Sequence, residues 1–199
     1  MRLEPTPETI VYIGQLMFER GLTDIAGGNV SCRAGEQIHI TPTGAGQQWH
    51  WRLEPEDILT APIATDELLD NPAHSHESIS HLLIYRAFPY VTAILHAHPI
   101  HVLPFCAAEQ PIPAAIKSAQ VYGEVFTFIK DTPAYSREQG EELVSALRTQ
   151  ESSMREFAGV ALVPQHGIFV AAPDMHRAVD CLERMNTNAW CNIAQALIT

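Results

Sequence analysis

The sequence predicts an α/β domain with a central, largely antiparallel sheet covered by helices. β-like runs and helical patterns follow one another in mixed order, beginning with a helix and a hairpin, which favours such a sheet over a parallel one. The 199 residues are 46% hydrophobic and 18% charged, as is ordinary for one compact domain with a real core. No internal repeat, low-complexity tract or linker divides the chain, so we expect residues 1–199 to form a single domain.

The chain opens with a helix followed by a β-hairpin. Thr6 caps the helix and Pro7 occupies an early position in it, and apolar residues then recur at helical spacing as far as the stop signal at Gly21. Two β-like runs at 30–33 and 37–41 are separated by a short glycine-containing turn, which is typical of a hairpin.

The later elements follow from the same signals. Pro89 ends a clear amphipathic helix, and the segment that begins at Ser136 resembles a capping box. We expect a short helical piece at 54–59, helices at 76–88, 136–147 and 174–197, and strands at 91–96, 124–129, 159–164 and 168–172.

Three histidines form the strongest candidate for chemistry. His96 and His98 end a β-like run, and because strand side chains alternate, both point to the same face. Two imidazoles on one face suit Zn²⁺ and similar ions, although a bare His-x-His also occurs as an ordinary pair of core or surface residues. His166, at a corner before Gly167, completes a three-imidazole set that leaves a position open for substrate.

Glu77 is the candidate acid/base. It lies at the start of the helix that precedes the His-x-His strand, where a carboxylate also simply complements the helix dipole. His81 follows one turn later on the same helix face, where it either orients the carboxylate or lines the core; we favour the core.

Two glycine-containing segments bracket the early hairpin. Gly28 and Asn29 precede its first strand, and Thr43 and Gly44 follow its second, while Ser75 lies next to the candidate acid/base. Backbone N–H groups and short polar side chains of this kind form nests for phosphate oxygens, or they serve as ordinary turns.

The composition excludes some classes of partner. The net charge of −11 disfavours nucleic acid and anionic membranes, and no apolar stretch is long enough to span a bilayer. The four cysteines form neither a C-x-x-C pair nor a disulfide framework, and no signal peptide opens the chain, so we expect a reduced, cytoplasmic protein.

Together these segments resemble the class II aldolase/adducin family, from about residue 10 to about residue 194. Any one motif is weak, but five in the family's order and separation are specific. They are Gly28-Asn29-Val30-Ser31, Thr41-Pro42-Thr43-Gly44, Ser75-His76-Glu77 followed by His81, His96-Ala97-His98, and Gln165-His166-Gly167.

The resemblance implies a three-layer α/β/α sandwich and a homotetramer with active sites between subunits. It implies one divalent metal per subunit on the three histidines, Zn²⁺ first, with Mn²⁺, Co²⁺ or Fe²⁺ as alternatives. It also implies proton transfer by Glu77, a residue type that favours the fuculose-phosphate aldolase branch. The residues that hold the substrate phosphate would be Gly28, Asn29, Thr43, Gly44 and Ser75.

Three positions depart from the family pattern. His76 stands where the family often has a second small hydroxyl residue. Lys117 stands where the fuculose-phosphate aldolases carry a tyrosine donated by a neighbouring subunit, and Tyr122 is near but out of register. A second tyrosine of those aldolases, on a C-terminal tail, has no counterpart up to Thr199.

The resemblance therefore implies a metal-dependent aldolase that cleaves a phosphorylated ketose to dihydroxyacetone phosphate and an aldehyde through a metal-stabilised enediolate. An alternative is a decarboxylase or dehydratase acting on a related sugar phosphate or sugar acid, in which Lys117 meets a second anionic group or is a plain surface lysine. A third, less favoured by the intact set of histidines and acid, is a non-catalytic adducin-like module.

Overall fold

The computed structural model describes residues 3–195 and 197–198 and has a six-stranded sheet at its centre. Neighbouring strands are all antiparallel, in the spatial order β3-β2-β1-β4-β8-β7. The strands are β1 (Asn29–Ala34), β2 (Gln37–Ile40), β3 (Leu59–Pro62), β4 (Ala93–Ala97), β7 (Gly159–Val163) and β8 (Gly167–Ala172). The expected antiparallel sheet is confirmed.

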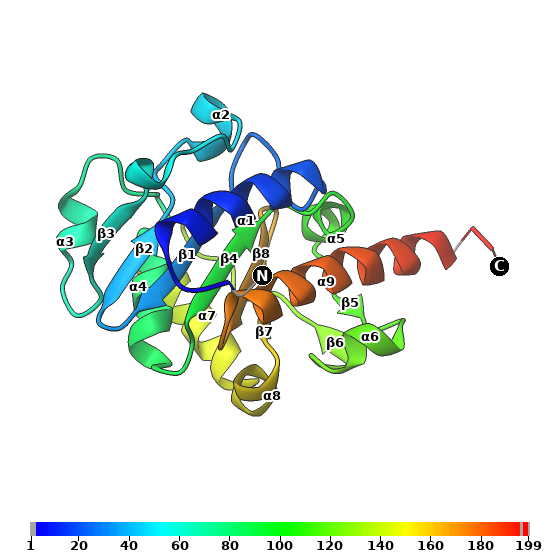
Figure 1. Cartoon of the computed structure of the whole chain (residues 1–199). Coiled ribbons are helices and arrows are strands. Elements are labelled where there is room, and N and C mark those ends of the chain that lie inside the picture. The colour runs from blue at the N-terminus through cyan, green and yellow to red at the C-terminus, as the bar shows by residue number, and fades with distance from the viewer. Residues whose placement is uncertain (1–2, 196, 199) are drawn as a thin grey trace.

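Helices cover both faces of this sheet and make three layers (Figure 1). On one face, α1 (Pro7–Glu19) and α9 (Met175–Gln195) bury apolar side chains against β1, β4 and β8. On the other face, α4 (Ser78–Ala87) and α7 (Arg137–Arg148) pack in a second core. Leu95 belongs to the first core and Ile94 to the second, as the alternation of side chains along a strand requires.

The helix starts follow the signals in the sequence. The Thr6 side chain accepts a hydrogen bond from the Thr9 N–H at the start of α1, and the Ser136 side chain accepts one from the Gln139 N–H at the start of α7. These bonds satisfy N–H groups that have no partner within the helix. The described chain contains no helix with the length and apolar character needed to cross a membrane.

Two expectations were wrong in detail. The segment 54–59 has only a 3-10 turn, η1 (Pro55–Asp57), and then enters β3 at the sheet edge. The strand expected at 124–129 shrinks to β6 (Val125–Phe126), which pairs with β5 (Ile112–Pro113) in a separate sheet. Pro113 has no N–H to donate, which limits how far this pairing extends.

Several short helices join these elements and were not expected from the sequence. They are α2 (Ala45–Trp49), α3 (Glu67–Asp70), α5 (Leu103–Ala108), α6 (Lys117–Gln120) and α8 (Glu151–Glu156).

Candidate active site

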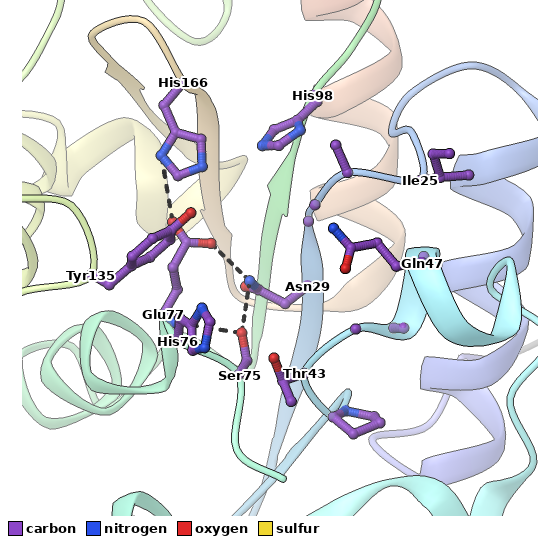
Figure 2. Close-up of a pocket in the computed structure, with 17 residues that line it drawn as sticks. Ile25, Asn29, Thr43, Gln47, Ser75, His76, Glu77, His98, Tyr135 and His166 are labelled. Atoms are coloured by element: carbon purple, nitrogen blue, oxygen red, sulfur yellow. Dashed lines mark hydrogen bonds and ion pairs between the residues drawn. The ribbon is translucent and has the colours of Figure 1, made fainter. Parts of the chain in front are cut away.

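A cavity of about 340 Å³ opens where β1 begins and β4 ends. It brings together residues that are far apart in the sequence (Figure 2). The candidate residues that line it are Gly28, Asn29, Thr43, Gly44, Ser75, Glu77, His98 and His166. His96 is fully buried beside Glu77.

The three histidines converge on one point from two neighbouring parts of the sheet. His96 lies in β4, His98 follows its end, and His166 lies in the turn between β7 and β8. Their ring centroids are 5.1 Å apart for His96 and His98, 4.7 Å for His96 and His166, and 5.1 Å for His98 and His166. One nitrogen from each ring lies within 4.8 Å of the others, so the three residues form a group that can hold a metal ion.

Hydrogen bonds on the outer side of the cluster fix which nitrogen faces inward. His96 Nδ1 donates to the Ile168 carbonyl at 3.1 Å, and His98 Nδ1 donates to Asp24 Oδ1 at 3.2 Å. Each ring therefore keeps its proton on Nδ1 and presents Nε2 as a lone pair. Both Nε2 atoms are buried without a hydrogen-bond partner among the described residues, and the donor set fits a divalent ion.

Glu77 lies against these imidazoles and is only 2% exposed. Its Oε2 lies 3.0 Å from His96 Nε2 and its Oε1 lies 3.9 Å from His166 Nδ1. Because His96 Nε2 is an acceptor, an ionised Glu77 would face it acceptor to acceptor. Burial raises the pKa of Glu77 to about 8, against a smaller lowering by its hydrogen bond from Asn29.

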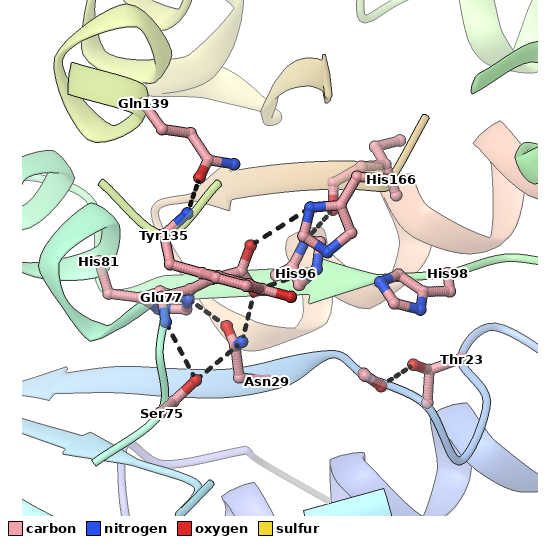
Figure 3. A network of polar contacts seen from close by, with 12 residues as sticks. Thr23, Asn29, Ser75, Glu77, His81, His96, His98, Tyr135, Gln139 and His166 are labelled. Carbon is pink, nitrogen blue, oxygen red and sulfur yellow. Dashed lines mark hydrogen bonds and ion pairs between the residues drawn. The ribbon is translucent and has the colours of Figure 1, made fainter. Parts of the chain in front are cut away.

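Asn29 links this carboxylate to the rest of the cavity. Its amide nitrogen donates to Glu77 Oε2 at 2.8 Å and to Ser75 Oγ at 3.1 Å (Figure 3). In the sheet, Asn29 lies directly opposite His96, so the pairing of β1 with β4 places the amide beside the histidine cluster.

His81 holds Asn29 from behind. Its Nε2 donates to Asn29 Oδ1, so its Nδ1 accepts from Ser31 Oγ at 2.7 Å, and Ser31 in turn accepts from the Tyr85 hydroxyl at 2.9 Å. Burial lowers the pKa of His81 to about 3, which keeps the ring neutral. His81 therefore lines the core, as expected, and also contacts the site through Asn29.

Two glycines, one just before β1 and one just before α2, form part of the backbone wall of the cavity. Gly28 has φ of +100°, and a Cβ there would lie 2.5 Å from Thr23 Oγ1. Gly44, with φ of +74°, precedes α2 next to Thr43. Both positions use backbone conformations that other residues rarely adopt, so the glycines shape this wall.

The structure separates Lys117 from these residues. Lys117 begins α6 as an exposed side chain and does not line the cavity of its own chain. His101 packs against Trp190 and does not line it either, whereas His76 does. The Tyr122 hydroxyl donates to Asp180 at 2.9 Å, away from the cavity.

Sequence reasoning missed Tyr135, Asp24 and Gln47. Tyr135 lines the cavity from the loop before α7, and Gln47 lines it from α2. Asp24 orients His98, as described above. Asp24 lies in an irregular loop and Gln47 in a five-residue helix, neither of which carries a periodic signal, and only the folded chain brings Tyr135 to His166.

Comparison with known proteins identifies the family. The model of the class II aldolase and adducin N-terminal domain matches residues 8–193. An L-fuculose phosphate aldolase of Methanococcus maripaludis strain C7 is 27% identical over 168 residues, which cover 84% of this chain and 85% of the relative.

Relatives with other named activities are equally similar. A 3-oxo-tetronate 4-phosphate decarboxylase of Haemophilus influenzae is 27% identical and covers 92% of this chain and 84% of its own. A methylthioribulose-1-phosphate dehydratase of Gluconobacter oxydans is 28% identical, and the match covers 94% of this chain and 90% of the dehydratase. All three named activities are lyase reactions.

A solved structure supports the same fold. An L-fuculose 1-phosphate aldolase superimposes with a TM-score of 0.82 and 20% sequence identity, covering 100% of this chain and 89% of that chain. With the family model matching nearly the whole chain, this protein belongs to the class II aldolase and adducin family.

Proposed function

We propose that this protein is a metal-dependent aldolase that cleaves a phosphorylated ketose to dihydroxyacetone phosphate and an aldehyde. The observation that carries the proposal is the buried Glu77 carboxyl group beside three converging imidazoles, two of which point an unpartnered nitrogen inward. A buried acid beside a cation site is the arrangement that moves a proton at a carbon next to a carbonyl group.

His96, His98 and His166 would hold the ion, and three imidazoles leave a position for substrate oxygens. A bound divalent ion supplies positive charge against the negative charge that develops on those oxygens. We favour Zn²⁺, with Mn²⁺, Co²⁺ or Fe²⁺ as alternatives, because imidazole ligands accept all four.

The substrate phosphate would bind at the end of the cavity lined by Thr43, Gly44 and Ser75, with Gly28 and Asn29 between that end and the histidines. Thr43 and Ser75 offer hydroxyl groups there, and the glycine backbone at Gly44, and at Gly28 nearer the histidines, allows close approach. The Asn29 amide would support phosphate binding by holding Ser75 in place while it also fixes Glu77.

Glu77 would carry the proton. As the carbon–carbon bond breaks, the hydroxyl group on the departing carbon loses its proton and becomes the aldehyde oxygen, while the bonding electron pair stays on the carbon next to the carbonyl group. The Glu77 carboxylate would accept the hydroxyl proton and then deliver a proton to that carbon, so that Glu77 ends the reaction as it began. Burial, which raises the pKa of Glu77 to about 8 in the metal-free protein, makes its carboxylate a stronger base for this proton transfer. The aldehyde is the other product.

The first test is release of dihydroxyacetone phosphate from a panel of ketose 1-phosphates, with and without a chelator. We expect release that the chelator abolishes and that added Zn²⁺ restores. His96→Ala should lose both bound metal and turnover, whereas Glu77→Gln should keep the metal and lose turnover. A His96→Ala protein that retains metal and turnover would contradict the proposal.

The second candidate is a decarboxylase or dehydratase that uses the same histidines and acid. The similarity to a decarboxylase and a dehydratase over more than nine-tenths of this chain supports it. If metal-loaded protein released no dihydroxyacetone phosphate from any member of the panel, assays for CO₂ release from 3-oxo sugar-acid phosphates and for dehydration of ketose 1-phosphates would decide between these reactions.

A further inference from the structure

Tyr135 has no part in the mechanism above, yet its ring faces the reacting end of the cavity. The ring lies edge-on to His166 at 5.8 Å between centroids and packs on His76 at 5.2 Å. Figures 2 and 3 show it reaching across Glu77 toward the histidines. Among the tyrosines of the described chain, Tyr135 alone lines this cavity, and no described residue hydrogen-bonds its hydroxyl group.

The backbone of Tyr135 is held in an unfavourable conformation. Its φ is +64°, in the left-handed region that bulky residues rarely enter. The Tyr135 N–H donates to Gln139 Oε1 at 2.6 Å, and the Gln139 side chain is 1% exposed. The Ser136 cap fixes Gln139 in turn, through the Gln139 N–H at 3.0 Å. Strain that the surroundings enforce in this way commonly marks a functional position.

Tyr135 also separates two spaces. A second cavity of about 320 Å³ lies beyond it, lined by Lys130, Thr132 and Gln139, and it shares Tyr135 and His166 with the first cavity. A sugar with its phosphate near Thr43 and its middle at the histidines must extend past Tyr135 to reach this space. A substrate bound in this way would bring its departing half past the Tyr135 side chain.

We propose that Tyr135 is a catalytic residue supplied by the same chain, and that its hydroxyl donates a hydrogen bond to the substrate oxygen on the carbon that leaves as the aldehyde. The proposal rests on the proposed function. A phenol here polarises the oxygen without itself losing a proton. Gln139 is the positioning residue that keeps the ring in place.

The test compares variants that remove one group at a time. Tyr135→Phe keeps the ring and loses the hydroxyl, so kcat for ketose 1-phosphate cleavage should fall about 10- to 100-fold. Tyr12→Phe is the matched control, because Tyr12 is 47% exposed and Tyr135 48%. Gln139→Leu should lower kcat, and Gln139→Glu, which keeps an acceptor oxygen, should restore it.

A binding measurement gives a readout apart from turnover. The polyol phosphate made by reducing a ketose 1-phosphate keeps every hydroxyl but has no carbonyl group to drive cleavage. Calorimetry with this ligand should give a Kd about 10-fold weaker for Tyr135→Phe than for the unaltered protein and Tyr12→Phe.

The outcomes separate the two proposals. Turnover and Kd of Tyr135→Phe within twofold of the unaltered protein would overturn the role of Tyr135 and leave the aldolase proposal standing. An unaltered protein that binds the polyol phosphate but cleaves no ketose would overturn the aldolase proposal, and the binding arm would still decide whether Tyr135 contacts the ligand. Absence of both binding and cleavage would overturn both.

Discussion

At the scale of single residues, the site is defined by where protons lie. His96 and His98 each donate a hydrogen bond from Nδ1 to an oxygen outside the cluster, so each inward nitrogen carries a lone pair. The Glu77 carboxyl group faces one of them at 3.0 Å. Two acceptors in contact need a proton or a cation between them. We therefore expect the site to release the Glu77 proton when it binds a metal ion.

This exchange predicts pH-dependent metal binding. With the pKa of Glu77 raised to about 8 by burial, Glu77 of the metal-free protein holds a proton between pH 6 and pH 8. Binding a divalent ion expels that proton, so the apparent affinity for Zn²⁺ should rise with pH, by up to about tenfold per unit, and level off above pH 8. Competition with a chelating dye across this range measures it.

Glu77→Gln supplies the control. A glutamine keeps an oxygen for the Asn29 amide but does not titrate, so the slope between pH 6 and pH 8 should flatten. Burial also lowers the pKa of His166 to about 4, so this ring is already neutral in that range. A slope that is the same in Glu77→Gln and in the unaltered protein would show that the proton comes from another group.

His81 predicts a dependence of stability on acid. Burial lowers its pKa in the folded state to about 3, from the usual 6.5 of a histidine. Below pH 6.5 the unfolded chain binds a proton at His81 that the folded chain excludes. The contribution of the neutral His81 ring to the free energy of unfolding is therefore complete above pH 6.5 and is lost as the pH falls toward 3. Between pH 7 and pH 5, it should lower the free energy of unfolding by about 2 kcal/mol.

Urea unfolding at the two pH values tests this. His81→Gln, which does not titrate, should lose less stability between pH 7 and pH 5 than the unaltered protein does. His176→Gln, at an exposed histidine on α9, should behave like the unaltered protein. Equal losses in His81→Gln and the unaltered protein would contradict the buried, neutral assignment.

At the scale of elements, the turn between β7 and β8 fits tightly against the end of β4. A Cβ on Gly167 would lie 2.4 Å from the Ala97 carbonyl oxygen and 2.8 Å from a carbon of the His98 ring. A backbone oxygen at that distance cannot move aside as a flexible side chain would. The glycine therefore sets how closely His166 approaches the two histidines of the neighbouring strand.

Gly167→Ala should thus loosen the site as well as the fold. We expect a loss of roughly 1–3 kcal/mol in the free energy of unfolding from overpacking, together with weaker Zn²⁺ binding. Gly35→Ala is the comparison, because Gly35 has φ of +61° but nothing within 4 Å of a Cβ. We expect Gly35→Ala to lower the free energy of unfolding without changing Zn²⁺ affinity. Unchanged Zn²⁺ affinity in Gly167→Ala would show that the turn does not set the histidine geometry.

Strong local patterns allowed the sequence to predict most elements. The antiparallel sheet and the long helices follow from hydrophobic period and caps, and Ser136 caps α7 as expected. The segments 54–59 and 124–129 failed because short runs take their pairing from distant neighbours, such as the bridge between Phe128 and Leu162.

The residues of the site also divide into those that the sequence predicts and those that it does not. The histidines and Glu77 carry recognisable spacing, and the fold brings them together in one cluster. Tyr135 has no such signal, because its place in the cavity depends on a left-handed backbone and on Gln139. The hydrogen bond from His81 to Asn29 could not be predicted from the sequence either, because the two residues lie on different elements.

At the scale of the whole molecule, the assembly stays a prediction. The resemblance to the family implies a homotetramer with sites between subunits, and within one chain Lys117 is exposed and away from the cavity. If sites lie between subunits, Lys117 would approach the cavity of a neighbouring chain. Its amino group would then meet an anionic part of the substrate.

Light scattering after size-exclusion chromatography tests the assembly. Four copies of the 22.0 kDa chain should elute with a mass of about 88 kDa. Lys117→Ala should then reduce turnover without changing that mass. A monomeric mass of about 22 kDa with full activity would rule out a shared site.

The sheet order has a consequence for how a bound ion affects motion. β4, which carries His96, lies inside the sheet, whereas β7, which leads into His166, is the last strand of the sheet and is bonded on its outer side only by the short segment 127–129. Edge strands open locally at lower free energy than central ones. An ion bound to both His96 and His166 would link β4 to the end of β7 across the intervening strand β8. Amide hydrogen exchange should therefore slow more in β7 than in β4 when metal is added.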